Sequence, residues 1–160
     1  MRRRDLLLVL GGAVVVVSAV TALQMLQART SERPRLAIRL GEDRCRRCGM
    51  IVSRLEFAGG ILLKGRREWY VYDDIGCFAY DYNEFASRGF EVEEVRVFDF
   101  RTKEELDARA AHYVLADPRR LWTPMSYGVV ALGRKSDADE VAGRYGGEVR
   151  DFWSMLSRFR

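Results

Sequence analysis

The sequence predicts an α+β fold, in which two small units, each with strands flanking one helix, follow an N-terminal transmembrane helix. Three observations support this prediction: an uncharged N-terminal stretch, short apolar runs that alternate like strands, and two segments with helical periodicity between such runs. The connections around the strands are short, which favours antiparallel pairing. With 160 residues, 48% of them hydrophobic, and only 3 prolines, the chain is predicted to be globular rather than disordered or repetitive.

Residues 1–30 form the predicted export segment. The stretch from Leu6 to Leu23 contains no charged residue, and as a helix it would rise about 27 Å, which is roughly one hydrocarbon core. Arginines at positions 2–4 predict that the N-terminus stays in the cytoplasm and that the rest is exported. A cleaved signal peptide and an uncleaved signal anchor both fit. The stretch exceeds the usual signal core of about 7–15 residues, so we favour a single-pass anchor in the cell membrane, with an extracytoplasmic domain.

Most of the net charge of +4 belongs to this segment. Residues 1–30 carry four arginines and one aspartate, a net charge of +3, which leaves +1 for residues 31–160. A nucleic-acid surface needs a clustered basic face on the folded part, so nucleic acid is not an expected partner. Residues 31–44 are predicted to be a linker, and residues 45–155 the folded domain, with units at about 45–100 and 110–155.

The first unit is predicted to contain strands at 55–64, 68–72 and 91–100. Gly59 and Gly60 predict a tight turn that divides the first of these runs into two strands. Asp74 is a natural N-cap for a helix whose apolar face continues to Phe85. With Asp74 assigned to the cap, Asp73 is expected to be an ordinary solvated carboxylate.

The second unit is predicted to contain strands at 113–115 and 126–132. Before it, Thr102 is expected to open a short helix, with Glu105 at the capping-box position. Ser136 and Asp139 are expected to cap a further helix, which ends at the glycine pair 146–147. Residues 149–152 form a strand or lead into a terminal helix.

The densest chemical motif comprises Cys45, Cys48 and Met50, three sulfur donors within six residues. Thiolate and thioether ligands select copper(I) over hard cations. The same spacing fits half of a structural zinc site, a dithiol redox pair or a structural disulfide. Zinc would need two further ligands, for which Cys77 and His112 are candidates because they are the remaining cysteine and the single histidine.

Two further positions have competing interpretations. Cys77 falls in the first turn of the predicted helix, where it is either a buried core residue or a metal ligand. Met125 follows a proline in a polar turn, which is not an obvious packing position, so it is a second thioether candidate. The arginines at positions 46–47 would favour thiolate formation or would simply lie in a solvated turn.

Together these motifs occur in the order and spacing of one family. Cys-x-x-Cys-Gly-Met at 45–50 is joined by further matching segments at 72–77, 99–100, 111–114, 123–128 and 146–149. The chain resembles the NosL family, the copper-binding accessory proteins of nitrous-oxide reductase, over residues 45–152. The resemblance implies two ββαβ units akin to part of alkylmercury lyase. It also implies a membrane-tethered copper(I) chaperone, not an enzyme, whose client is nitrous-oxide reductase or another copper protein.

The resemblance also implies a ligand set. Cys48, Met50 and Met125 would hold copper in two- or three-coordination, and Cys45 would complete the site or receive the ion during exchange. Phe98 stands where many members have a histidine, so an imidazole ligand from that place is absent. A structural zinc module and a tethered dithiol oxidoreductase are the alternatives from other functional classes.

Overall fold

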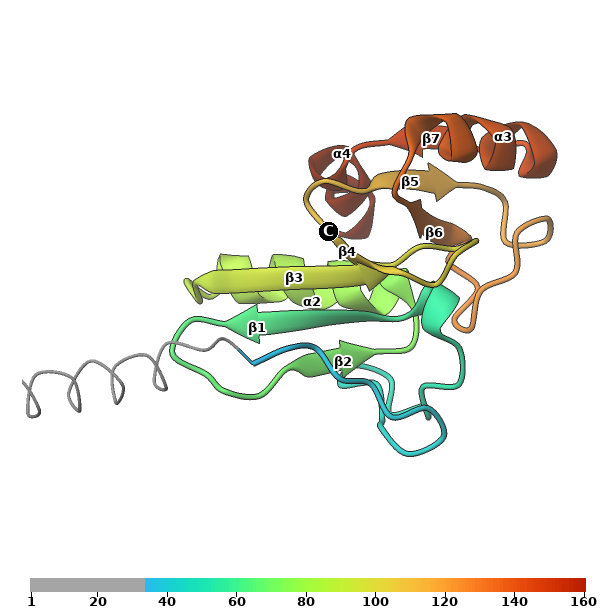
Figure 1. Cartoon of the computed structure of the whole chain (residues 1–160). Helices are drawn as coiled ribbons and strands as arrows, with labels where there is room; N and C mark the ends of the chain where they lie inside the picture. Colours follow the sequence, from blue (N-terminus) through green and yellow to red (C-terminus); the bar gives the residue numbers. More distant parts are fainter. Residues whose placement is uncertain (1–33) are drawn as a thin grey trace, which may run out of the picture. The chain divides into compact units, whose positions relative to one another are not determined.

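Two antiparallel sheets form the framework of residues 34–160, the part of the chain that the computed structural model describes (Figure 1). The first sheet has the order β2-β1-β3-β4, with β1 at Gly59–Leu63, β2 at Tyr70–Tyr72, β3 at Val92–Phe98 and β4 at Glu105–Asp107. The second sheet has the order β6-β5-β7, with β5 at His112–Leu115, β6 at Val129–Leu132 and β7 at Glu148–Arg150. All strand pairs within the sheets are antiparallel, as predicted.

Three α-helices complete the described part, which confirms the α+β class. They are α2 at Ile75–Ser87, α3 at Lys135–Tyr145 and α4 at Phe152–Leu156; short 3-10 turns lie at Leu55–Phe57 and Ser157–Phe159. Both sheets contain the order strand, strand, helix, strand, and β4 is added to the first sheet as a fourth strand. None of these helices is long and apolar enough to cross a membrane. The predicted anchor at residues 1–30 lies outside the described residues.

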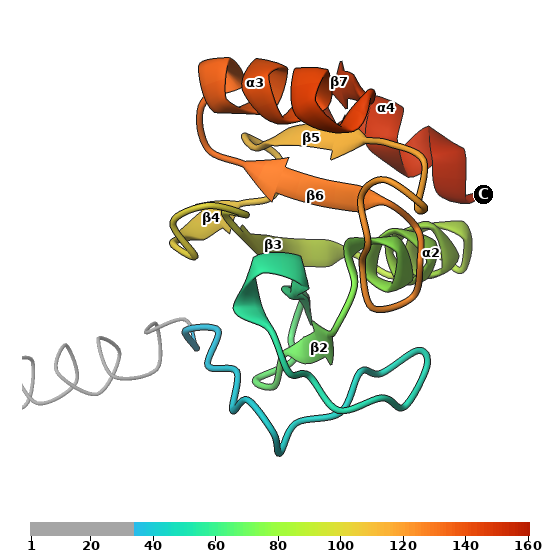
Figure 2. The same ribbon diagram turned by 90° about the vertical axis from the view of Figure 1, so that its right-hand side faces the viewer.

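The two sheets share one core. Helix α2 packs on the first sheet and α3 on the second, while α4 contacts both α2 and β5 (Figures 1 and 2). Phe78 of α2, Tyr113 of β5 and Phe152 of α4 belong to a single buried cluster. A parallel bridge between Asp99 and Ala131 joins the sheets directly. Residues 35–160 therefore form one compact unit.

The predicted turn at the glycine pair is wrong. Gly59 and Gly60 are the first two residues of β1, where they pair with both β2 and β3. A Cβ on Gly60 would collide with the side chain of Leu36. The glycines therefore allow close packing across the sheet instead of reversing the chain.

The predicted helix at Thr102 is also wrong, because Glu105 begins β4. The carboxylate of Asp99 accepts hydrogen bonds from the backbone N–H groups of Arg101 and Thr102, which closes a turn between β3 and β4. The cap of α3 differs as well, since the helix begins at Lys135, before the two residues expected to cap it, and has no side-chain cap. The left-handed residue that ends this helix is Gly146, as predicted.

Candidate metal centre

Four side chains converge where β2 meets α2. The ligand atoms of Cys45, Cys48, Asp73 and Cys77 all lie within 4.8 Å of one another. Cys45, Asp73 and Cys77 are buried, whereas Cys48 is partly exposed, and none of the three cysteines forms a disulfide. We call this group the thiol cluster.

A tight turn presents the first two cysteines. The backbone N–H of Cys45 donates to the carbonyl of Met50 at 2.8 Å, and the N–H of Gly49 donates to the carbonyl of Cys45 at 2.9 Å. Gly49 has a φ of 77°, a left-handed conformation that suits glycine because it has no Cβ. The Cys-x-x-Cys-Gly spacing therefore produces a closed turn with both thiols in one cluster.

The junction between β2 and α2 supplies the other two members. Asp74 caps α2 as predicted, since its carboxylate accepts from the backbone N–H of Gly76 at 2.7 Å. This cap sets the direction of the first helical turn, which carries Cys77. The second oxygen of Asp74 accepts from the backbone N–H of Met125 at 2.9 Å, so the β5–β6 loop is tied to the start of α2 (Figure 2).

Asp73 is the ligand candidate that the sequence prediction missed. It was expected to be solvated, but only 2% of its surface is exposed. One carboxylate oxygen accepts from Cys48 Sγ at 3.3 Å, while the other is buried without a hydrogen-bond partner among the described residues. An orphaned buried oxygen is costly, and a cation bound in the thiol cluster would compensate for it. An aspartate pair before a helix suggests only a cap, so the pattern gave no sign of this role.

The thiols perturb one another. A hydrogen bond from Cys77 lowers the pKa of Cys45 to about 7, although burial acts in the opposite direction. Burial raises the pKa of Cys48 to about 12, and the bond to Cys45 together with burial raises the pKa of Cys77 far above its usual range. One thiolate therefore forms near neutral pH, and it is stabilised by a neighbouring thiol rather than by an arginine.

The remaining predicted ligands lie in different surroundings. Met125 is partly buried and packs against the core cluster that contains Cys45 and Cys77. Met50 is 47% exposed at the end of the Cys-x-x-Cys-Gly turn and is not a member of the thiol cluster. His112 opens β5 opposite Leu132 and is not a member of the thiol cluster. The two interpretations of Cys77, burial and ligation, are compatible, since it is buried inside the cluster.

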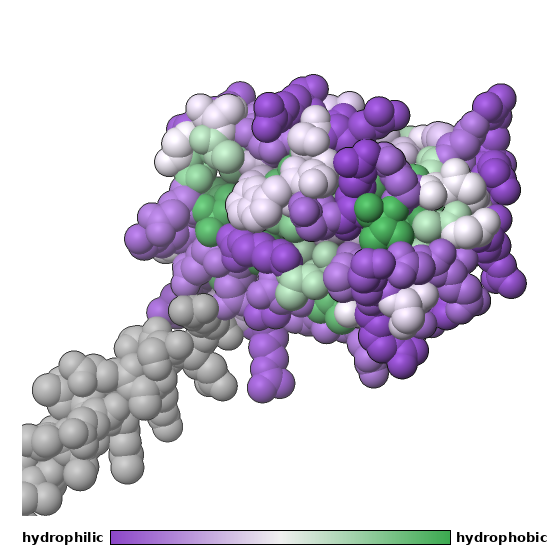
Figure 3. All heavy atoms as spheres, turned by 90° about the horizontal axis from the view of Figure 1, so that it is seen from above, coloured by the Kyte–Doolittle hydropathy of each residue, from purple (hydrophilic) through white to green (hydrophobic). Residues whose placement is uncertain are grey.

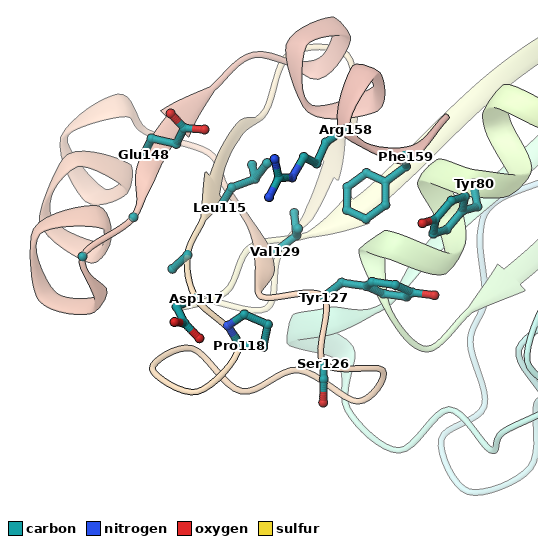
Figure 4. Close-up of a pocket in the computed structure, with 13 residues that line it drawn as sticks. Tyr80, Leu115, Asp117, Pro118, Ser126, Tyr127, Val129, Glu148, Arg158 and Phe159 are labelled. Atoms are coloured by element: carbon teal, nitrogen blue, oxygen red, sulfur yellow. The ribbon is translucent and has the colours of Figure 1, made fainter.

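A surface pocket of about 790 Å³ lies apart from these thiols. Tyr80, Tyr127 and Phe159 line one side, and Asp117 and Glu148 contribute carboxylates (Figure 4). None of the thiol-cluster residues lines it. The thiol cluster is therefore the better candidate for soft-metal chemistry.

Seen from above, the molecule is mainly hydrophilic, with small separate hydrophobic areas (Figure 3).

Comparison with known proteins shows which fold and which family the chain shares. The structure is similar to the crystal structure of the copper chaperone NosL from Shewanella denitrificans, with a TM-score of 0.61 and 20% sequence identity over 76% of this chain and 94% of that chain. A search of curated proteins gave no match. The family model described as NosL matches residues 38–157. Because this match covers well over half of the sequence, the chain belongs to the NosL family.

Proposed function

We propose that this chain is a copper chaperone that binds copper(I) at the thiol cluster. The observation that carries the proposal is the convergence of three thiol sulfurs within 4.8 Å, with an unpartnered carboxylate oxygen on the same group. Thiolates are soft ligands and prefer copper(I) to hard cations. The similar crystal structure is that of a copper chaperone, which supports the same conclusion.

The geometry suggests how each residue would act on the cargo ion. Cys45 supplies the first thiolate because its pKa is lowered to about 7. Cys48 is the partly exposed member of the cluster, so it is the natural point for entry and exit of the ion. Met125 and Met50 would contribute thioether sulfur, the former from the loop tied to α2 and the latter from the exposed turn. Low coordination leaves a position for a ligand of the client.

Anaerobic titration with copper(I) against a chromogenic chelator tests this function. The wild-type chain is expected to take up one ion, and Cys48→Ser is expected to weaken binding strongly because it removes a thiolate. His112→Ala is the matched control and should leave the affinity unchanged, since this residue lies outside the cluster. Absence of binding, or equal binding by Cys48→Ser, contradicts the proposal.

Zinc binding is a second candidate, and Asp73 is the observation that favours it. Three cysteines and one carboxylate make a four-ligand set of the kind that Zn²⁺ accepts in tetrahedral sites. This set replaces the Cys3His combination considered from the sequence, because the fourth ligand is Asp73 and not His112. Competition between the two metals, followed by metal analysis under anaerobic conditions, separates the candidates.

We further propose that the chain is held in the cell membrane by residues 1–30, with its folded unit on the extracytoplasmic side. Its client would be nitrous-oxide reductase or another copper protein, and it would perform no catalysis itself. Membrane fractionation of cells that express the full chain tests the tether. Mixing the copper-loaded chain with metal-free reductase and measuring copper on each protein after separation tests the client. Copper that stays on the chain contradicts this choice of client.

A further inference from the structure

The two residues between the cysteines bind a single buried carboxylate. Both arginines of the Cys-Arg-Arg-Cys turn form ion pairs with Asp81 of α2, which has 1% of its surface exposed. Arg46 Nη1 pairs with one carboxylate oxygen, and Arg47 Nη1 lies 2.7 Å from the other. The hydroxyl of Tyr72 donates to the same carboxylate at 3.0 Å. Neither arginine is simply part of a solvated turn.

Aromatic rings hold the same two guanidinium groups. Arg46 lies over the rings of Tyr70 and Phe85, with its Cζ 4.7 Å and 4.6 Å from the two centroids. Arg47 lies 4.7 Å from the centroid of Tyr80. Cation–π contacts of this kind restrain a long, flexible side chain. The turn is thereby packed onto β2 and α2 through its arginines.

Asp81 and one cysteine of the thiol cluster lie on the same part of α2. Asp81 follows Cys77 by four residues, and positions i and i+4 lie on the same face of a helix, one turn apart. Arg46 also donates its backbone N–H to the carbonyl of Val71 at 2.9 Å, next to the β2 end that leads into Asp73. One face of α2 therefore carries both Cys77 and Asp81, the carboxylate that binds the turn with the other two thiols.

We propose that Asp81 is a positioning residue of the metal centre. It holds the 45–48 turn so that the thiols of Cys45 and Cys48 stand beside Cys77 before any metal arrives. A buried ion pair contributes little net stability compared with an apolar replacement, so the role assigned to this pair is to fix the geometry of the turn. Groups that orient ligands in this way typically affect metal affinity about 10–100-fold. This inference rests on the proposed copper-binding function.

The test is Asp81→Asn in the full chain, which removes both ion pairs and keeps the size of the side chain. Copper(I) affinity is expected to fall about 10–100-fold, and exchange of the backbone amides of the turn, Arg46 and Gly49, should accelerate relative to amides of α3. The matched control is Asp139→Asn, which removes the exposed pair with Lys135 and should stay within about twofold of wild type. A folded Asp81→Asn chain that binds copper within about twofold of wild type overturns the inference.

A second variant covers the possibility that Asp81→Asn does not fold. Arg47→Gln removes one of the two ion pairs at a side chain that is 35% exposed, and Arg46 remains to neutralise the buried carboxylate. A loss of affinity and faster exchange in the same direction are expected, and unchanged values refute the positioning role. If the wild-type chain binds no copper, the proposed function fails, while the exchange rates still decide whether Asp81 holds the turn.

Discussion

Replacement of Asp74 provides a stringent test of how the metal centre is assembled. Its carboxylate has no exposed surface and accepts two backbone hydrogen bonds, one from Gly76 and one from Met125. Loss of an N-cap costs about 1 kcal/mol, and leaving a buried N–H without its acceptor costs about 1–3 kcal/mol. We therefore expect Asp74→Ala to reduce the free energy of unfolding by about 2–4 kcal/mol.

Asp74→Asn separates these two contributions. Asparagine is as good an N-cap as aspartate, so the bond to Gly76 can remain. Its amide has only one oxygen, so whichever way it turns, one of the two backbone N–H groups faces an NH2 group instead of an acceptor. The expected loss is about 1–3 kcal/mol, together with weaker copper binding if the loop that carries Met125 is released.

Thermal unfolding followed by circular dichroism measures these effects. For a folded unit of this size, 1 kcal/mol corresponds to about 4 °C in Tm, so Asp74→Ala should lower Tm by about 8–16 °C. Asp151→Ala is the control, because Asp151 is an exposed N-cap of α4 that accepts from the backbone N–H of Ser154; its expected shift is about 4 °C. A Tm for Asp74→Asn equal to wild type, or equal shifts for both alanine variants, refutes the reasoning.

Three further predictions concern the same region. Copper(I) binding should release about one proton fewer at pH 8 than at pH 6, because the pKa of Cys45 is lowered to about 7 and this thiol has already lost its proton at pH 8. The affinity for copper(I) should therefore rise with pH. Calorimetry in buffers of different ionisation enthalpy counts the protons that are released. Gly76→Ala should destabilise the fold by about 1–3 kcal/mol in urea denaturation, since a Cβ there collides with the ring of Tyr127, whereas Gly143→Ala in α3, with open space around it, should be neutral or stabilising. Chelation of all metal should leave the far-UV circular dichroism unchanged, while loss of that signal would favour a structural zinc site.

Local patterns predicted the elements that local interactions determine. The helix after Asp74 and the left-handed stop at Gly146 depend on neighbours within a few residues, and both were predicted. The glycine pair in β1 and the strand at Glu105 were missed because their conformations depend on partners distant in the chain. Gly60 must clear Leu36, and β4 exists because it pairs with β3. A capping-box pattern has no information about such a pairing.

The candidate site also combines features that local interactions determine with features that depend on distant partners. The spacing of Cys45 and Cys48 predicted a turn that brings the two thiols together, because this turn is closed by its own backbone. Asp73 and Asp81 were missed because each acts across 25 or more residues, one on Cys48 and the other on the two arginines of the turn. Their burial reverses the usual expectation for a carboxylate, and burial of this kind follows only from packing.

The packing of the folded unit also bears on whether the metal is structural or cargo. A structural zinc supplies folding energy that a small domain otherwise lacks. Residues 35–160 instead contain three buried hydrophobic clusters, and the cysteine turn has backbone hydrogen bonds and ion pairs to Asp81 of its own. A fold that is stabilised by such clusters does not depend on metal–ligand bonds, so it can lose a bound ion without unfolding. Transfer to a client requires reversible loading, so this core supports the proposed cargo copper over a structural zinc.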